Sequence, residues 1–330
     1  MYSYLNYNIS LFYRDFIKKE YDRDMRNYIF SSAVGLIVLT LVQFLTLSSK
    51  NDSLQVYFLD VGQGDSALVS YPTGERLLID TGKDSKVFRS LDQVLPWYDK
   101  TIDYVLITHG DADHLGAMLD LLDRYEVKKV FVSQFFGQIE IEKQILLRLE
   151  LEGATVEVVT QGDMLTFGTS ISNSFEIIHP APNCFEKFNQ SENECSLVTL
   201  LTYGDHTFLF TGDIGQKVEP QITPSIPSPL TVLKVGHHGS NGSSGTPFIK
   251  AIKPQYSVIS AGENSYGHPH PEVIERLSSA SSTIFNTKVD ATIVASTDGT
   301  LFEIKQLFDQ TSFFKSSICS VLLYGFDTSC

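Results

Sequence analysis

The feature that most constrains the fold is a loop rich in metal-ligating residues that directly follows an apolar strand. Residues 104–107 (YVLI) predict a buried strand, and residues 109–114 (HGDADH) come next, before an apolar-periodic helix that begins at Leu115. A loop held between a strand and a helix can aim several short side chains at one point, which a metal site requires. An Asp-rich loop is often only solvated, but two histidines at this spacing after an apolar strand favour a metal site.

The same arrangement recurs twice further along the chain. Residues 207–210 precede Thr211-Gly212-Asp213, and residues 231–235 precede Gly236-His237-His238-Gly239-Ser240. Each run places a ligand-type side chain at a strand end, and the adjacent glycines allow close approach of the backbone. A single Gly-Asp is a common turn, so the signal comes from the three segments together.

From Leu54 onward, short apolar runs separated by Gly, Asp and Asn predict strands that alternate with helices. The expected strands are residues 55–59, 67–70, 77–79, 104–107, 129–132, 155–159, 175–178, 197–202, 207–210, 231–235, 257–259, 293–295 and 301–304. The expected helices are residues 115–124, 140–151, 247–252 and 271–278. Two mixed sheets packed face to face with helices outside would satisfy this order around one core, an α/β fold.

Six motifs, in order, now carry a family resemblance. They are LDVGQGD at 59–65, IDTG at 79–82, THGDADH at 108–114, TGD at 211–213, GHHGS at 236–240 and GHPH at 267–270. Together they resemble the extracytoplasmic metallo-β-lactamase-like domain of ComEC-type competence proteins, from about residue 55 to about residue 304. The resemblance implies a metallo-β-lactamase αββα sandwich and a site for two divalent metal ions, zinc or manganese.

Position by position, the resemblance assigns His109, Asp111 and Asp213 to one metal. Asp113, His114, Asp213 and His237 would hold the other, with Asp213 bridging. The chain departs from the family pattern at two places. Asp111 stands where the wider superfamily has His, and Asn193-Glu194-Cys195-Ser196 stands where a further His ligand is expected.

Further residues have expected roles beside open alternatives. Asp80 is either an orienting partner of a ligand or a simple turn residue. His238 could replace His237 as a ligand, and only one of the two should reach the metals because successive strand residues point to opposite sides. His268 and His270 could bind a phosphate oxygen or protonate a leaving group, or be surface histidines. Ser240, Ser243 and Asn264 could donate hydrogen bonds to the substrate, or be polar residues of the loops.

The implied activity is metal-assisted hydrolysis, with Asp113 orienting the attacking water. The resemblance implies single-stranded DNA as substrate, cut as a phosphodiester outside the membrane. One alternative is a hydrolase acting on a small ester, thioester, lactam or phosphodiester, since the fold hosts many reactions. The other is a non-catalytic scaffold of the same fold, which the missing His would suit.

Charge limits how such a protein can hold nucleic acid. The formal net charge is -14 and the sequence pI is about 4.9, which excludes a broad basic binding face. The two metal ions and local lysines such as Lys83, Lys86 and Lys234 would have to offset the repulsion at the site. We therefore expect weak, salt-sensitive binding of DNA.

Residues 29–47 contain no charge and predict a single membrane-spanning helix, taken as residues 29–48. A cleaved signal peptide is the open alternative. The basic residues of the leader, residues 1–28, place that leader in the cytoplasm and the hydrolase domain, residues 51–305, outside the cell membrane. Residues 306–330 form a tail with no assigned structure. In this exported part the sequence-adjacent pairings, Cys184 to Cys195 and Cys319 to Cys330, are the expected disulfides, and free structural thiols are the open alternative.

Overall fold

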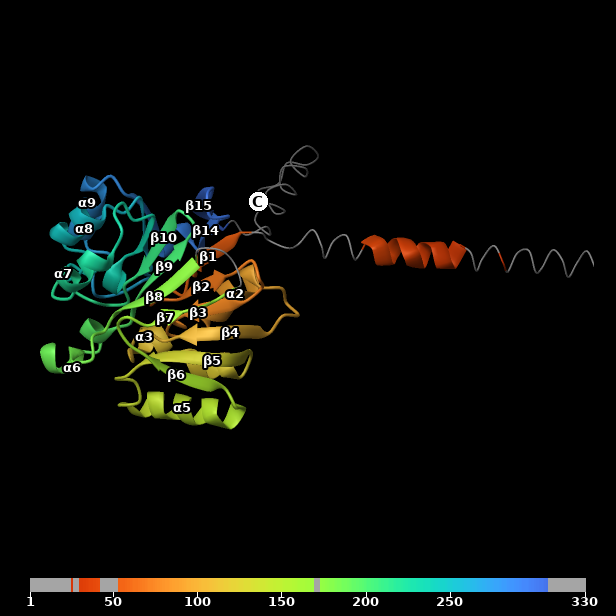
Figure 1. Cartoon of the computed structure of the whole chain (residues 1–330), viewed down its shortest axis with the longest axis horizontal. Coiled ribbons are helices and arrows are strands. Elements are labelled where there is room, and N and C mark those ends of the chain that lie inside the picture. The colour runs from red at the N-terminus through yellow and green to blue at the C-terminus, as the bar shows by residue number, and fades with distance from the viewer. Residues whose placement is uncertain (1–24, 26–29, 42–52, 169–172, 308–330) are drawn as a thin grey trace, which may run out of the picture. The chain divides into compact units, whose positions relative to one another are not determined.

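The computed structural model describes residues 25, 30–41, 53–168 and 173–307 (Figure 1). The chain divides into two compact units, residues 1–51 and 52–330. In the first unit, residues 30–41 are helical and exposed, whereas residues 42–48 of the expected anchor lie outside the described residues. Among the residues that are described, no helix has the length and apolar character needed to cross a membrane.

The second unit contains two sheets. Within its described residues, the eight-stranded sheet has the order β15-β14-β1-β2-β3-β4-β5-β6, and the seven-stranded sheet has the order β13-β12-β11-β10-β9-β8-β7. The first sheet comprises β1 (Leu54–Phe58), β2 (Ala67–Ser70), β3 (Arg76–Ile79), β4 (Thr101–Leu106), β5 (Glu126–Ser133), β6 (Thr155–Val159), β14 (Ile293–Thr297) and β15 (Phe302–Gln306). The second comprises β7 (Met164–Leu165), β8 (Asn173–His179), β9 (Val198–Tyr203), β10 (His206–Phe210), β11 (Val232–Lys234), β12 (Tyr256–Ile259) and β13 (Thr283–Asn286).

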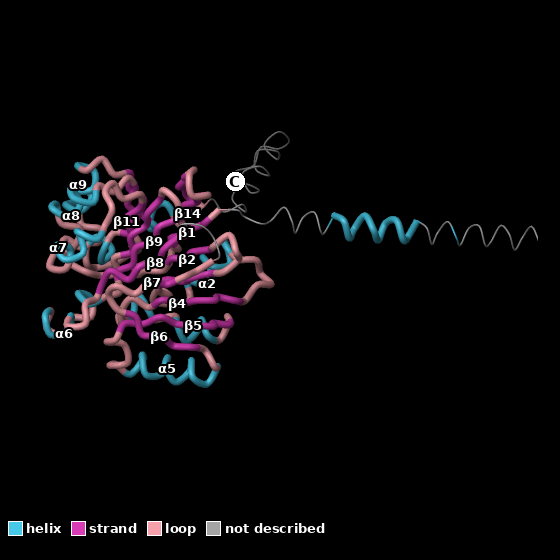
Figure 2. The backbone as a smooth tube through the Cα atoms, in the orientation of Figure 1, coloured by secondary structure: helices cyan, strands magenta, loops and turns pink. Residues whose placement is uncertain are grey.

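Helices cover the outer faces of both sheets, while strands fill the centre (Figure 2). The main ones are α2 (Lys86–Val94), α3 (Ala112–Leu115), α4 (Met118–Leu122), α5 (Glu140–Glu152), α7 (Glu219–Ile222), α8 (Thr246–Ile252) and α9 (Pro271–Ser279). Shorter helical turns are α6 (Cys184–Lys187), α10 (Thr287–Asp290), η1 (Asn193–Cys195), η2 (Thr223–Ser225) and η3 (Gly236–Gly239). In Figure 1, α7, α8 and α9 lie together on one side and α5 lies at the opposite end.

Three buried clusters hold these layers together. The central one lies between the sheets and includes Phe58, Phe175 and Phe208, all of them almost fully buried. A second cluster packs α2, α4 and α5 on the eight-stranded sheet, and a third packs α8 and α9 on the other sheet. Each fully buried Leu or Phe contributes about 1.5–3 kcal/mol, so three continuous apolar layers fix the sandwich. The expected α/β sandwich of two mixed sheets is confirmed.

The strand ends decide where a site can form. The strands β3 to β6 run parallel, as do β10 to β13, so the carboxyl ends of each set gather at one edge. The two edges meet, because the backbone N–H of Leu197, just before β9, donates to the carbonyl of Thr108, just after β4, at 2.9 Å. Ligand sites in α/β sheets form at such carboxyl ends.

A disulfide joins Cys184 to Cys195, as expected. The other expected pair, Cys319 with Cys330, lies outside the described residues.

Candidate metal centre

The loops after β3, β4, β10 and β11 bring the candidate ligands together. The register pairs Ile79 with Leu106 and Phe210 with Lys234, so Asp80 lies beside the loop after β4, and Asp213 lies beside the loop after β11. Four side chains from these segments and from the loop after β1 form one buried group, namely Asp65, His114, Asp213 and His238. Their potential ligand atoms all lie within 4.8 Å of one another.

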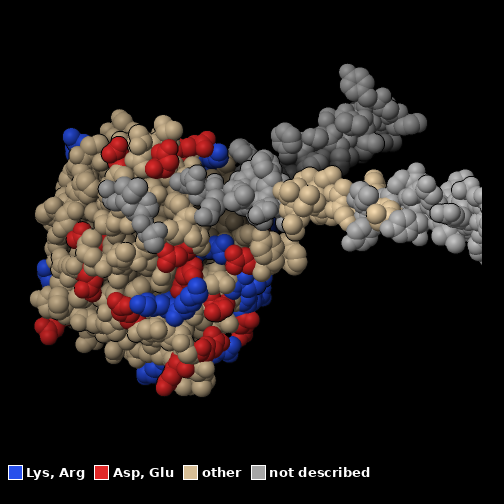
Figure 3. All heavy atoms as spheres, turned by 45° about the vertical axis from the view of Figure 1, so that its right-hand side comes forward, with Lys and Arg blue, Asp and Glu red and all other residues tan. Residues whose placement is uncertain are grey.

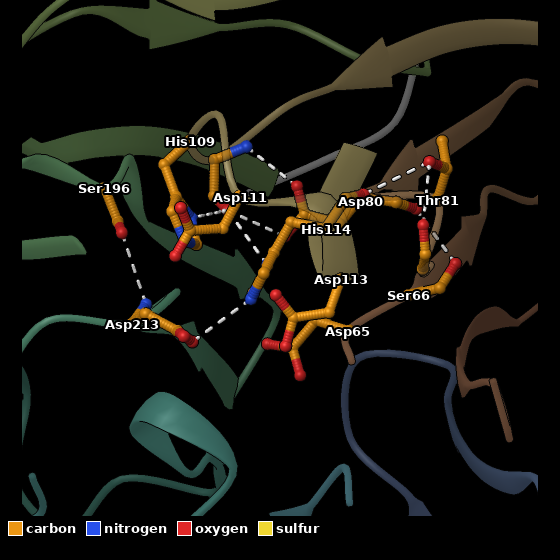
Figure 4. Close-up of polar contacts among 12 residues, drawn as sticks. Asp65, Ser66, Asp80, Thr81, His109, Asp111, Asp113, His114, Ser196 and Asp213 are labelled. Carbon is orange, nitrogen blue, oxygen red and sulfur yellow. Dashed lines mark hydrogen bonds and ion pairs between the residues drawn. The ribbon is translucent and has the colours of Figure 1, made fainter. Parts of the chain in front are cut away.

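Asp80 fixes the orientation of His114 (Figure 4). Its carboxylate accepts from the backbone N–H of Thr108 at 2.8 Å and from the Thr108 hydroxyl at 2.7 Å. The same carboxylate lies 2.7 Å from Nδ1 of His114. Because a carboxylate only accepts, Nδ1 of His114 carries the proton and Nε2 faces Asp213 Oδ1 at 3.3 Å. Asp80 does this from a left-handed backbone conformation, with φ of 58°, which few non-glycine residues adopt.

His109 is oriented through the same network. The Thr108 hydroxyl donates to Asp80, so its oxygen is free to accept from Nδ1 of His109, 3.0 Å away. This leaves Nε2 of His109 facing Oδ2 of Asp111 at 3.6 Å. The His109 ring lies against that of His114, with ring centroids 4.1 Å apart. One buried carboxylate thereby sets the tautomer of two imidazoles.

In His238, as in His109 and His114, Nδ1 is bonded to an acceptor and Nε2 faces carboxylates. Its Nδ1 lies 3.0 Å from the backbone carbonyl of Ser260 and 3.1 Å from Oδ1 of Asp65, which are both acceptors. Its Nε2 then faces carboxylates, at 3.2 Å from Oδ2 of Asp113 and 3.5 Å from Oδ2 of Asp213. The imidazole is almost fully buried, whereas the side chain of His237 is 36% exposed.

The expectation that only one of the His237–His238 pair could reach the site assumed an extended strand. Both residues instead adopt left-handed conformations, with φ of 49° and 53°. Strand alternation does not apply to such a turn, and Nε2 of His237 also approaches Oδ2 of Asp213, at 3.7 Å. Both imidazoles therefore converge on one carboxylate.

Asp213 lies at the centre of the group. One of its oxygens faces His114 and the other faces His237 and His238. Burial alone would raise the pKa of Asp213, but His238 and His114 hold it well below its usual range. Burial likewise opposes charge on His114, yet Asp213 and Asp80 hold the pKa of that ring well above its usual value. The buried carboxylates thus favour a positive charge at the centre of the site.

Asp65 and Lys234 form a buried ion pair that the motifs did not predict. Nζ of Lys234 lies 2.6 Å from Oδ2 of Asp65, and both side chains are at least nine-tenths buried. The loop that carries Asp65 contacts the loop after β4 closely, since its Gly64, at φ of 135°, lies where any Cβ would meet the Asp113 carbonyl at 2.2 Å. The sequence signal was present, because Asp65 lies in the LDVGQGD motif between β1 and β2.

The donor set fits a divalent metal ion. Nε2 of His109, His114 and His238, Oδ1 of Asp65 and Oδ1 of Asp213 are all buried without a hydrogen-bond partner. Buried polar atoms are rarely left unpaired, and imidazoles whose Nδ1 is already bonded present Nε2 as a ligand. Mixed imidazole and carboxylate donors suit zinc and manganese.

The segment in which the resemblance implies a further His ligand supplies no imidazole to the site. Ser196, from the segment where a His was expected, is fully buried, and its hydroxyl accepts from the backbone N–H of Asp213 at 3.3 Å. The same hydroxyl donates to the carbonyl of Asn193 at 2.8 Å. Ser196 therefore supports the Asp213 loop and leaves His109 and Asp111 as the candidate donors on that side.

The loop after β12 carries Asn264, His268 and His270, whereas Ser240 lies in the loop after β11. The His268 ring lies 5.6 Å from that of His237, and its Nδ1 is buried without a partner. Asn264 uses its side chain within the loop, donating to the carbonyls of Gly262 and His268 and accepting from the N–H groups of Tyr266 and His268. The His270 side chain pairs with Glu272, and the Ser240 hydroxyl accepts from Gly242. Of this set, the structure brings only His268 against the candidate ligands.

Comparison with known proteins agrees with this geometry. A family model described as "Beta-lactamase superfamily domain" matches residues 75–239. ComE operon protein 3 of Bacillus subtilis is 32% identical, over 78% of this chain and 34% of its own length. Competence protein ComA of Neisseria gonorrhoeae is 31% identical, over 66% of this chain and 28% of its own length. Recombination protein 2 of Haemophilus influenzae is 26% identical, over 78% of this chain and 31% of its own length. The chain thus spans about a third of the length of these curated relatives.

Solved structures show the same fold. The metallo-beta-lactamase fold protein YhfI of Bacillus subtilis has a TM-score of 0.50 at 14% identity, covering 74% of this chain and all of its own. The CmlA beta-hydroxylase has a TM-score of 0.50 at 15% identity, covering 74% of this chain and 54% of its own. At such low identity, these likenesses establish the architecture alone.

Proposed function

Because this chain belongs to the beta-lactamase superfamily, we propose that it is a membrane-anchored, metal-dependent phosphodiesterase that cleaves DNA outside the membrane. One observation carries the proposal: three buried imidazole Nε2 atoms without hydrogen-bond partners face the carboxylates of Asp111, Asp113 and Asp213. Carboxylate and imidazole donors converging in this way are the ligands of a hydrolytic metal pair.

The proposed ligands divide between two positions. His109, Asp111 and Asp213 would hold the first ion. Asp113, His114 and Asp213 would hold the second, together with an imidazole of the His237–His238 pair and with Asp65 nearby. Bound zinc or manganese would polarise a phosphoryl oxygen and lower the pKa of water.

Other residues have roles of their own in this proposal. Asp113, whose Oδ2 faces His238, is partly exposed at the rim and would orient the attacking water. Burial, followed by the nearby His237 and His238, lowers the pKa of His268. The ring is therefore neutral near pH 7, which favours hydrogen bonding to a phosphate oxygen over protonation of the leaving group.

DNA is the substrate that the relatives support. One of them is named as a competence protein and one as a recombination protein, and this chain matches about a third of each. Acidic and basic side chains are interspersed on the face shown in Figure 3, without a continuous basic surface. We therefore expect DNA to be held mainly at the metal centre and by local cations, with strong salt dependence.

The location outside the membrane rests on two features of the chain. Residues 29–48 are apolar and follow a leader with several basic residues, which supports an anchor with its leader in the cytoplasm. The Cys184–Cys195 disulfide supports an oxidising compartment for the hydrolase domain.

One observation favours a second candidate, a non-catalytic scaffold. Ser196 occupies the segment where a His ligand is expected and supports the Asp213 loop instead. Metal analysis of the purified full chain separates the two. We expect about two ions per chain, whereas fewer than about one would favour the scaffold.

The activity test compares wild type, Asp213→Ala and Asp205→Ala, all as full chains with single-stranded DNA and manganese or zinc. Asp205 lies in the exposed turn between β9 and β10 and serves as a matched control. We expect wild type and Asp205→Ala to cleave and Asp213→Ala to lose at least about a hundredfold of the rate. Equal cleavage by all three would show that the site is wrongly assigned. Cleavage of bis(p-nitrophenyl) phosphate but not DNA would favour a small substrate.

A further inference from the structure

A cavity of about 620 Å³ lies on the other side of the loop that carries Asp65. Its lining comes from this loop, from α2, from the loop after β12, from α10 and from the end of β15. The volume is within the range of pockets that enclose small organic ligands, roughly 300–1,000 Å³. None of the assigned metal ligands lines it.

Two cations at this cavity are free to bind a ligand. Lys86 and Arg89 lie on α2, are exposed, and form no ion pair with any residue that the structure describes. A third cation, Lys288, lies 3.2 Å from the carboxylate of Glu263.

Two of the three carboxylates in the lining accept hydrogen bonds from neighbouring amide groups. Asp60 accepts from the backbone N–H of Gly62 at 3.1 Å. Asp290 accepts from the backbone N–H of Asn286 at 2.8 Å and from the side chain of Gln306. The lining has three cationic and three acidic side chains, and Lys86 and Arg89 are the two cations without an ion-pair partner among the described residues. These two side chains are therefore the groups that would contact an anion.

The cavity and the metal centre share one loop. Lys86 packs against Gly62, since Nζ lies 2.9 Å from the position of a Cβ on that glycine, whose φ is 74°. Gly62 is three residues from Asp65, so the two α-carbons are at most about 11 Å apart. On the same side, Gln63 accepts through Oε1 from the backbone N–H of Gly262 at 3.3 Å. A ligand bound at Lys86 would therefore contact the same loop that carries Asp65 into the metal centre.

We propose that this cavity binds a phosphate group of a nucleotide, held by Lys86 and Arg89. The inference rests on the proposed function, because a nucleotide ligand presupposes a nucleic acid substrate. Two sources share this chemistry: a phosphate of the substrate strand beyond the cleaved bond, and the phosphate of a released mononucleotide.

The test is a binding measurement, so it does not depend on cleavage. The full chain carrying Asp213→Asn is titrated with a fluorescein-labelled oligothymidylate of about a dozen nucleotides, and separately with dTMP. The variant is Lys86→Gln/Arg89→Gln. The matched control is Lys250→Gln/Lys253→Gln, which removes two exposed charges at the end of α8, on the other sheet.

We expect the variant to bind at least one ligand about tenfold more weakly than the control. Loss of oligothymidylate affinity, with a salt slope reduced by about 0.7 per phosphate contact, identifies the strand as the source. Loss confined to dTMP identifies the released nucleotide. If both ligands bind the variant and the control equally, the cavity is not a phosphate site. Absence of DNA cleavage by the wild-type chain, with the binding difference intact, would refute the proposed function but not this site.

Discussion

His109, His114 and His238 have the same hydrogen-bonding pattern. In each, Nδ1 is bonded to an acceptor and Nε2 faces carboxylates. For His109 and His114 the pattern depends on Asp80. Its strained backbone conformation is maintained because the carboxylate is held by three hydrogen bonds.

We therefore expect Asp80→Asn to lower the affinity for manganese by about 10- to 100-fold, because the amide cannot accept from all three donors. Chelator competition with purified protein measures the change. Asp120→Asn, on the exposed face of α4, is the control and should bind as wild type does. Unchanged affinity in Asp80→Asn would contradict the orienting role.

The buried pair of Lys234 and Asp65 leads to a stability prediction. Lys234→Met leaves a buried carboxylate uncompensated, so the free energy of unfolding should fall by about 3–5 kcal/mol. Adding Asp65→Asn should restore part of the loss. Urea unfolding followed by circular dichroism measures both. Lys129→Met, which breaks a half-exposed pair with Glu157, should cost less than about 1 kcal/mol, and an equal cost at both lysines would refute the argument.

For single residues, the sequence predicted which residue types lie in the site better than it predicted how their side chains are oriented. The motifs pointed to His109, His114 and Asp213, and these three lie together. They did not predict that His237 and His238 both turn into left-handed conformations, because periodicity describes only regular backbone. Lys234, expected to offset repulsion of DNA, is instead occupied with Asp65.

Among the elements, the connection between β8 and β9 supports the loop that carries Asp213. It contains α6, η1 and Ser196, and the Cys184–Cys195 disulfide closes it. His179, at the end of β8, donates through Nε2 to the carbonyl of Glu194 at 2.8 Å. Because the Ser196 hydroxyl also accepts from the backbone N–H of Asp213, order in this connection helps to position the Asp213 carboxylate.

Replacing both cysteines, Cys184→Ala/Cys195→Ala, should lower the free energy of unfolding by about 3 kcal/mol, the chain-entropy value for a loop of this length. Urea unfolding with and without reductant measures it. Reductant should lower the stability of wild type to a similar extent and leave the variant unchanged. Equal sensitivity of both proteins would assign the effect to other cysteines.

Regular, strongly patterned elements were predicted closely, as with α5 and α9. The helix α2 and the strand β13 were missed. The sequence of α2 contains valines, a serine and an aspartate, which are weak helix formers, and its helical form depends on packing Val87, Phe88 and Leu91 onto the sheet. The four residues of β13 contain no alternating pattern and pair only because β12 lies beside them.

For the whole molecule, pH changes the balance of stability through Glu219. Its carboxylate is buried and accepts from the backbone N–H of Gly245 at 2.9 Å, and burial raises its pKa to about 7, from an ordinary value of 4.5. A raised pKa for an acid means that the folded state prefers the protonated form. The contribution of Glu219 to the free energy of unfolding is therefore largest below pH 4.5 and is lost as the pH rises toward 7.

We therefore expect the stability of wild type, relative to Glu219→Gln, to fall by up to about 3 kcal/mol between pH 4.5 and 7 and to stay level above that range. Glutamine stays neutral throughout and serves as the reference. Urea midpoints of the two proteins across this range measure the difference. Parallel curves would show that Glu219 titrates normally.

The centre takes donors from segments that begin with Asp65 and end with His238, and it needs both sheets to be in place. A chain still being synthesised, or one with a single sheet formed, holds at most a fragment of that constellation. The four buried donors therefore come together only once both sheets have formed, and a partly folded chain has no complete set of donors for a metal ion.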